Sequence, residues 1–119
     1  MYENWIYNDR NYRLFAILAN VRNHFNIIPI DCPRGLPKDI SNVVFEEYKS
    51  YGISAHSASY FTFRELLEFD WDGNYYKENE QVLSYRDIAG EFLENIEKYK
   101  KDSNITDLIS VRIVFWFDS

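Results

Sequence analysis

The run Val111–Asp118 constrains the fold of this chain more than any other stretch. After Arg112, five residues in a row are β-branched or aromatic, Ile113-Val114-Phe115-Trp116-Phe117. Such residues favour extended backbone, and an unbroken apolar run lacks the alternation of a strand with one wet face. The run therefore predicts a strand covered on both faces, in the centre of a small β-sheet. Three to four helices packed on that sheet fit the rest of the chain, so the expected class is α+β.

The chain has 119 residues, the usual size of one domain, and no repeat or Gly/Ser linker divides it. We therefore expect a single domain over residues 1–119. Cys32 is the one cysteine, which excludes an intramolecular disulfide and a thiolate zinc cluster. The first residues lack the pattern of a signal peptide, and no apolar run reaches membrane-spanning length. We expect a cytoplasmic protein with no metal, no cofactor and no membrane partner.

Apolar spacing and capping residues predict four helices. The first spans residues 12–22, with Asp9 or Asn11 as its cap and Leu14, Ile17 and Leu18 on its buried face. The other three are expected over residues 42–51 (capped by Ser41, ended by Gly52), 63–69 (opened by a Thr62–Glu65 capping box) and 85–100 (capped by Ser84). Besides the C-terminal strand, short strands are expected over residues 3–7 and 75–83, and extended or irregular backbone over 53–61.

The segment Asn23–Lys38 is expected to be irregular, because it contains all three prolines of the chain. Long irregular loops in compact domains often carry function. If this loop folds back on the first helix, Arg34 and Arg22, together with Arg10 and His56, can line a site for a small anion. The alternative, which we favour, is that the arginines pair with carboxylates and fasten the loop.

Histidine is the commonest general acid or base, and the chain has two, His24 and His56. His56 is flanked by serines, and a Ser–His pair can activate a nucleophile. Adjacent side chains of an extended strand point to opposite faces, however, so we interpret the serines as structural hydrogen-bonding groups and expect no catalytic residue. No phosphate-binding, dinucleotide-binding, zinc-protease or esterase motif occurs. The chain is therefore more typical of a binding protein than of an enzyme.

The net charge is −6, and the segment from Glu65 to Glu97 holds ten acidic residues against two basic ones, a local charge of −8. This segment repels a phosphate backbone, so direct nucleic-acid binding is disfavoured. Either its acids only solubilise the protein, or they bind a basic protein partner through Glu91, Glu94 and Glu97. The chain has ten Tyr, nine Phe and three Trp. Either these aromatic side chains only fill the core, or some of them also form a contact surface for a partner.

Several stretches resemble a family of small proteins encoded by bacteriophages and prophages. They span nearly the whole chain and are Arg10–Asn23, Pro33–Pro37, His56–Ser59, Thr62–Leu67, Asp70-Trp71 and Val111–Asp118. The chain resembles a short form of this family, with only a brief connection between Trp71 and Ser84. The resemblance implies phage origin and residence in the cytoplasm of the bacterial host, and it implies no activity and no site residue.

Two functions from different classes follow. The first is a phage-type accessory protein, a non-enzymatic binding protein or inhibitor that acts on a host component through a protein surface. A host defence system is the expected target, with an anti-CRISPR role as one candidate. The alternative is a small-ligand protein that binds or hydrolyses a nucleotide-like anion near Arg22, Arg34 and His56. A purely structural phage component is a third hypothesis, and self-association is left open.

Overall fold

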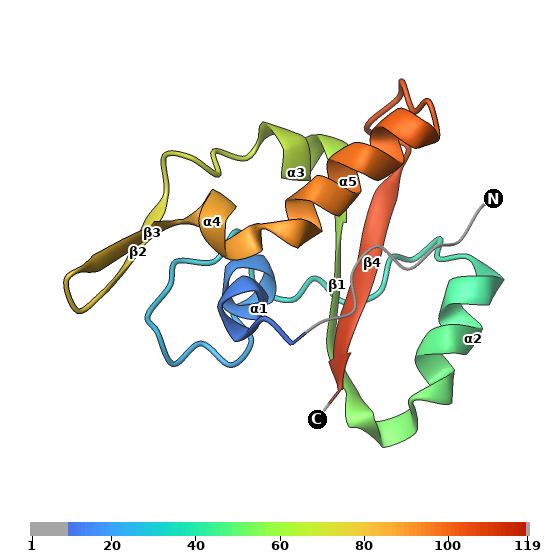
Figure 1. Ribbon diagram of the computed structural model, residues 1–119. Coiled ribbons are helices and arrows are strands. Elements are labelled where there is room, and N and C mark those ends of the chain that lie inside the picture. The colour runs from blue at the N-terminus through green and yellow to red at the C-terminus, as the bar shows by residue number, and fades with distance from the viewer. Residues whose placement is uncertain (1–9, 119) are drawn as a thin grey trace.

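A computed structural model describes residues 10–118 of the chain (Figure 1). The strand expected over residues 3–7 lies outside the described residues. The elements in chain order are α1 (Tyr12–Ala19), α2 (Asn42–Ser50), the 3-10 turn η1 (Gly52–Ser54), β1 (Ala55–Thr62), α3 (Phe63–Glu68), β2 (Tyr75–Glu78), β3 (Gln81–Ser84), α4 (Tyr85–Ala89), α5 (Glu91–Asp102) and β4 (Arg112–Asp118). Helices and short antiparallel strands alternate irregularly along the chain, which confirms the α+β class.

The C-terminal strand β4 pairs with β1 in antiparallel register. Phe61 lies opposite Ile113, and Ser59 lies opposite Phe115. Strands β2 and β3 pair only with each other and form a separate hairpin. Among residues 10–118, β4 therefore has one strand neighbour and is half of a pair, not the middle of the wider sheet that the sequence predicts.

Both faces of β4 are contacted by other elements, but the burial that its apolar run predicts is only partial: Phe117 is buried and residues 112–116 are half-buried. Side chains alternate along a strand, so Phe115 and Phe117 share one face and Trp116 takes the other. Phe115 and Phe117 pack toward the helical core. Trp116 packs edge-on against Tyr48 and Tyr51 around α2, with ring centroids 5.3 and 5.7 Å apart. Figure 1 shows α2 on the side of the β1–β4 pair opposite the other helices.

The core lies on the other side, where α1, α3, α4 and α5 cover the strand pair (Figure 1). These are four of the five α-helices among residues 10–118, and α4 and α5 together take the place of the one helix expected over residues 85–100. The largest side chains that are less than 2% exposed are Phe61, Phe63, Leu14, Ile17, Leu66 and Ile96. No helix among residues 10–118 has the length and apolar composition needed to cross a membrane.

The helix starts follow the predicted caps. The Asn11 side chain accepts a hydrogen bond from the Leu14 N–H, and the hydroxyls of Ser41, Thr62 and Ser84 accept equivalent bonds at α2, α3 and α4. The Thr62–Glu65 capping box is complete. Local side-chain chemistry therefore determines where these helices begin.

Two predicted elements are wrong because one residue in each adopts positive φ. The expected strand over residues 75–83 is a hairpin that turns at Asn79-Glu80, where Asn79 has φ 57°. The expected helix over residues 85–100 is broken at Gly90, whose φ of 40° and ψ of −109° only glycine adopts readily. α5 then runs on to Asp102, two residues past the predicted end.

The first helix is also shorter than predicted. It ends at Ala19, because Asn20 adopts the left-handed conformation (φ 56°) and its N–H bonds to Ala16 O at 2.9 Å. Val21 is still buried although it lies past the helix. The apolar pattern that predicts a helix to residue 22 thus includes a residue, Val21, that is buried from a turn and not from a helix.

Candidate functional site

The proline-containing loop runs along the edge of β1 that does not pair with β4. The Gly35 N–H donates to Ala58 O at 2.8 Å, and the Arg34 N–H donates to Ser59 Oγ at 3.0 Å. Ser59 is fully buried, so its hydroxyl needs such a partner. No regular element forms between Asn20 and Ser41, as the prolines predict.

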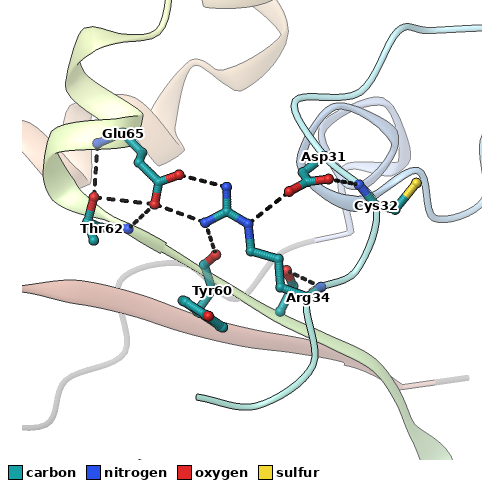
Figure 2. A network of polar contacts seen from close by, with 7 residues as sticks. Asp31, Cys32, Arg34, Tyr60, Thr62 and Glu65 are labelled. Atoms are coloured by element: carbon teal, nitrogen blue, oxygen red, sulfur yellow. Dashed lines mark hydrogen bonds and ion pairs between the residues drawn. The ribbon is translucent and has the colours of Figure 1, made fainter. Parts of the chain in front are cut away.

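The Arg34 side chain joins this loop to α3 and β1 (Figure 2). Its two Nη atoms donate to the two carboxylate oxygens of Glu65 at 2.9 and 2.6 Å. Nε donates to Asp31 at 3.0 Å, and Nη1 also donates to Tyr60 O at 3.1 Å. The guanidinium lies 4.3 Å from the centroid of the Phe61 ring. Bidentate pairing and stacking are the two contacts that a planar guanidinium makes best.

The electrostatics of this network favour the charged forms of all three groups. The hydrogen bonds from Arg34 hold the pKa of Glu65 below its usual value, although burial opposes this shift. The same guanidinium, helped by the Cys32 N–H, lowers the pKa of Asp31. Glu65 raises the pKa of Arg34 in turn. One arginine is thus shared between two carboxylates.

Glu65 has a second role at the start of α3. Its Oε1 accepts the Thr62 N–H at 3.0 Å in the capping box, while the same oxygen accepts from Arg34. The carboxylate therefore fixes both the first turn of α3 and the position of the loop. This geometry agrees with the interpretation that Arg34 fastens the loop.

The other three predicted ligand residues, Arg10, Arg22 and His56, are linked to one another around the far end of β1. His56 lies opposite Phe117 in the strand pair, with their rings 6.1 Å apart. The ring of Phe117 packs on Phe15 of α1, and Phe15 packs on Tyr12 of the same helix. The Arg22 guanidinium lies 5.2 Å from the centroid of the Tyr12 ring. A hydrogen bond with Tyr12 raises the pKa of Arg10.

We call Arg10, Tyr12, Arg22, His56 and Phe117 the strand-end cluster. Arg34 does not belong to it, because it contacts β1 at Tyr60, four residues further along, a span on the order of 13 Å. Three intervening rings, those of Tyr12, Phe15 and Phe117, lie on the path of contacts from Arg22 to His56, and Arg34 lies elsewhere along β1.

His56 and Ser57 form a hydrogen-bonded pair, with 3.0 Å between Nδ1 and Oγ. The expectation that these neighbours point to opposite faces is wrong. The strand is irregular between His56 and Ser59, and Ser57 has φ 55°, which breaks the alternation of side chains. The pair lies at a strained bulge, where each group satisfies the other.

The acidic segment is divided between paired and unpaired carboxylates. Five of its ten acids lie within ion-pair distance of an arginine, namely Glu65, Glu68, Asp72, Glu78 and Glu97. Glu97 is the loosest of these, 3.9 Å from Arg86. The sequence predicts the charge of this segment but does not show which acids the fold neutralises.

Asp87, Glu91 and Glu94, which we call the acidic strip, follow one another along α4 and α5 and are all exposed. None of them takes part in the ion pairs found among residues 10–118. Glu91 and Glu94 lie in the first turn of α5, which has no side-chain cap, so they also stabilise the positive end of that helix. The strip contains two of the three predicted partner-binding residues.

In the part of the chain that the structure describes, no three His, Cys, Asp or Glu side chains are grouped so as to hold a metal ion. Cys32 is a free, exposed thiol in the proline-containing loop. A comparison with protein families found no matching family model, and comparisons with curated proteins and with solved structures found no match. The function is therefore argued from the geometry of the chain.

Proposed function

We propose that this chain is a non-enzymatic binding protein that engages a basic surface of a protein partner through the acidic strip on α4 and α5. The observation that carries the proposal is the division of the acidic segment. An acid paired with an arginine of its own fold has little attraction left for a partner, whereas an exposed acid outside such a pair remains available to one. Asp87, Glu91 and Glu94 are of the second kind.

The partner proposed is a host component, because the sequence resembles phage-encoded proteins. A host protein that handles nucleic acid has lysines and arginines arranged to meet phosphates, and carboxylates on a helix can bind the same cations. Inhibition then follows from occupation of that basic surface. A defence protein with a nucleic-acid groove is the partner that fits both the charge and the resemblance.

Capture from a bacterial lysate tests the proposal. The baits are the wild-type chain, a strip variant (Asp87→Asn, Glu91→Gln, Glu94→Gln) and a control variant (Glu46→Gln, Glu47→Gln, Glu80→Gln). Both variants change the net charge by the same amount, and the control residues are exposed acids outside the strip. The strip variant should lose a basic partner that the control retains, and salt should release that partner from the wild type. Identical capture by all three baits would remove the strip from the account.

A second candidate function is anion binding at the strand-end cluster. Arg22 is exposed, and none of the ion pairs found among residues 10–118 involves it. A path of ring contacts through Tyr12, Phe15 and Phe117 leads from it to His56. A nucleotide-like phosphate would bind between Arg10, Arg22 and His56. Calorimetry with pooled nucleotides tests this, with Arg22→Gln expected to abolish binding and Arg34→Gln to preserve it. Absence of any binding heat for the wild type would eliminate this candidate.

A further inference from the structure

Residues 31–36, which we call the strap, cross the edge of β1 between two anchors. On one side the Ile30 N–H bonds to Ile17 O in α1 at 2.7 Å, and on the other Pro37 is buried. Between these anchors Asp31, Cys32, Pro33 and Gly35 are exposed, and Arg34 and Leu36 are half-buried. The strap therefore gains little from burial of apolar surface.

The strap covers groups that otherwise belong to an open strand edge. The Gly35 N–H donates a hydrogen bond to Ala58 O, and the Arg34 guanidinium donates one to Tyr60 O. The Arg34 N–H donates to Ser59 Oγ. Unpaired groups of this kind on an edge strand attract the backbone of other chains, and a covering loop is one way in which proteins prevent that. The strap substitutes side-chain and turn contacts for a neighbouring strand.

One side chain supplies most of the attachment. The bonds from the Gly35 and Arg34 backbone are ordinary neutral hydrogen bonds, whereas the pairing of Arg34 with Glu65 is bidentate and charge-assisted. Asp31, the other carboxylate bound to Arg34, belongs to the strap itself and moves with it. The same guanidinium donates to Tyr60 O and lies over the Phe61 ring. Loss of the Arg34 side chain therefore removes every charged contact found among residues 10–118 between the strap and the rest of the fold, and it leaves the neutral backbone bonds.

We propose that the strap opens as a unit while the rest of the fold stays intact, and that Arg34 bound to Glu65 is the latch that keeps it closed over the β1 edge. Segments with few buried apolar contacts and exposed backbone open locally at a lower free energy than the global one. Pro33 and the buried Pro37 restrict the backbone of the strap, which favours movement about its ends. The proposal concerns the chain alone and does not depend on the acidic strip.

Thiol labelling under native conditions tests the proposal. In a Cys32→Ser background, Ser59→Cys places a thiol beneath the strap, and Ala89→Cys places one in the core, where Ala89 is 1% exposed. The thiol at position 59 should react at least roughly tenfold faster than the thiol at position 89, because local opening of the strap suffices to expose it. Its rate should be nearly flat in low urea, whereas the rate at 89 should rise steeply. Equal rates with equal urea dependence would overturn the proposal.

Substitution of the latch is the second part of the test. Arg34→Ala should accelerate labelling at 59 by about tenfold in the absence of urea, and Arg34→Lys by less, since it keeps the charge. The control is Arg64→Ala, which removes an exposed ion pair with Glu68 on the same helix α3 and should leave the rate unchanged. Hydrogen exchange of the Gly35 amide in the unsubstituted protein reports the same opening. A Gly35 amide that exchanges only with global unfolding would contradict the proposal.

Discussion

Arg34 and Glu65 lie 31 positions apart in the sequence and are joined by two parallel hydrogen bonds of 2.9 and 2.6 Å. With Asp31 and the Tyr60 carbonyl, this pair uses donors on all three nitrogens of the guanidinium. An arginine so occupied has little capacity left for a ligand. Arg34 therefore belongs to the architecture of the fold.

Acid should destabilise the protein through this network. The folded state lowers the pKa of Glu65 from its ordinary value of 4.5, so the unfolded chain binds a proton more readily. The stability that Glu65 contributes is complete above about pH 4.5 and is lost as the pH falls through the lower, folded-state pKa. Asp31 shifts in the same direction and adds to the loss.

Urea unfolding at several pH values between 7 and 3 measures this effect. Glu65→Gln should be less stable than the wild type at pH 7 and should lose less stability on acidification, so the two curves converge at low pH. Parallel curves would show that the carboxylate of Glu65 does not contribute through its ionisation.

Gly90→Ala should destabilise the protein by about 1–3 kcal/mol, because φ of 40° with ψ of −109° is strained for any residue with a Cβ. The sign of the effect is informative. In an unbroken helix the same substitution would stabilise by about 1 kcal/mol. Chemical denaturation therefore distinguishes the break between α4 and α5 from the continuous helix that the apolar pattern predicts.

Trp116→Ala should release α2 while leaving the helical core folded. α2 has no fully buried residue, and its ring contacts to β4 come from Tyr48, with Tyr51 just past its end. We expect a loss of about 2–3 kcal/mol, less than the roughly 3–5 kcal/mol for truncation of a fully buried aromatic residue, since Trp116 is only half-buried.

Hydrogen exchange read by mass spectrometry checks this prediction. Peptides from α2 should lose protection, and those from α5 should keep it. Phe115→Ala, on the opposite face of β4, should instead lower protection throughout the core. Unchanged protection of α2 in Trp116→Ala would mean that other contacts hold the helix.

The features that the sequence predicts correctly are local. Caps at Asn11, Ser41 and Ser84 act within one turn of helix, and the apolar run at the C-terminus requires cover on both faces whatever the neighbours are. The α+β class follows from such patterns. The positive φ of Asn20 and Asn79 was not predictable, because asparagine tolerates both signs of φ.

The sequence pattern does not indicate the helix break at Gly90, for a different reason. Apolar residues at helical spacing continue across it from Ala89 to Phe92 and Ile96, so the pattern indicates one helix. The partners of Arg34 were also beyond prediction. With nineteen acidic residues in the chain, a sequence offers many carboxylates, and only the fold selects Glu65.

A double-mutant cycle on the free energy of unfolding, with Arg34→Ala, Glu65→Ala and the double variant, tests most directly whether the Arg34–Glu65 pair stabilises the fold. The cycle cancels the loss of the capping box, since that loss occurs with or without Arg34. The same cycle on the exposed pair Arg64 and Glu68 should give about 0.3–0.5 kcal/mol. A coupling of about 1 kcal/mol or more between Arg34 and Glu65 is the predicted result, and additive effects of the two substitutions would contradict it.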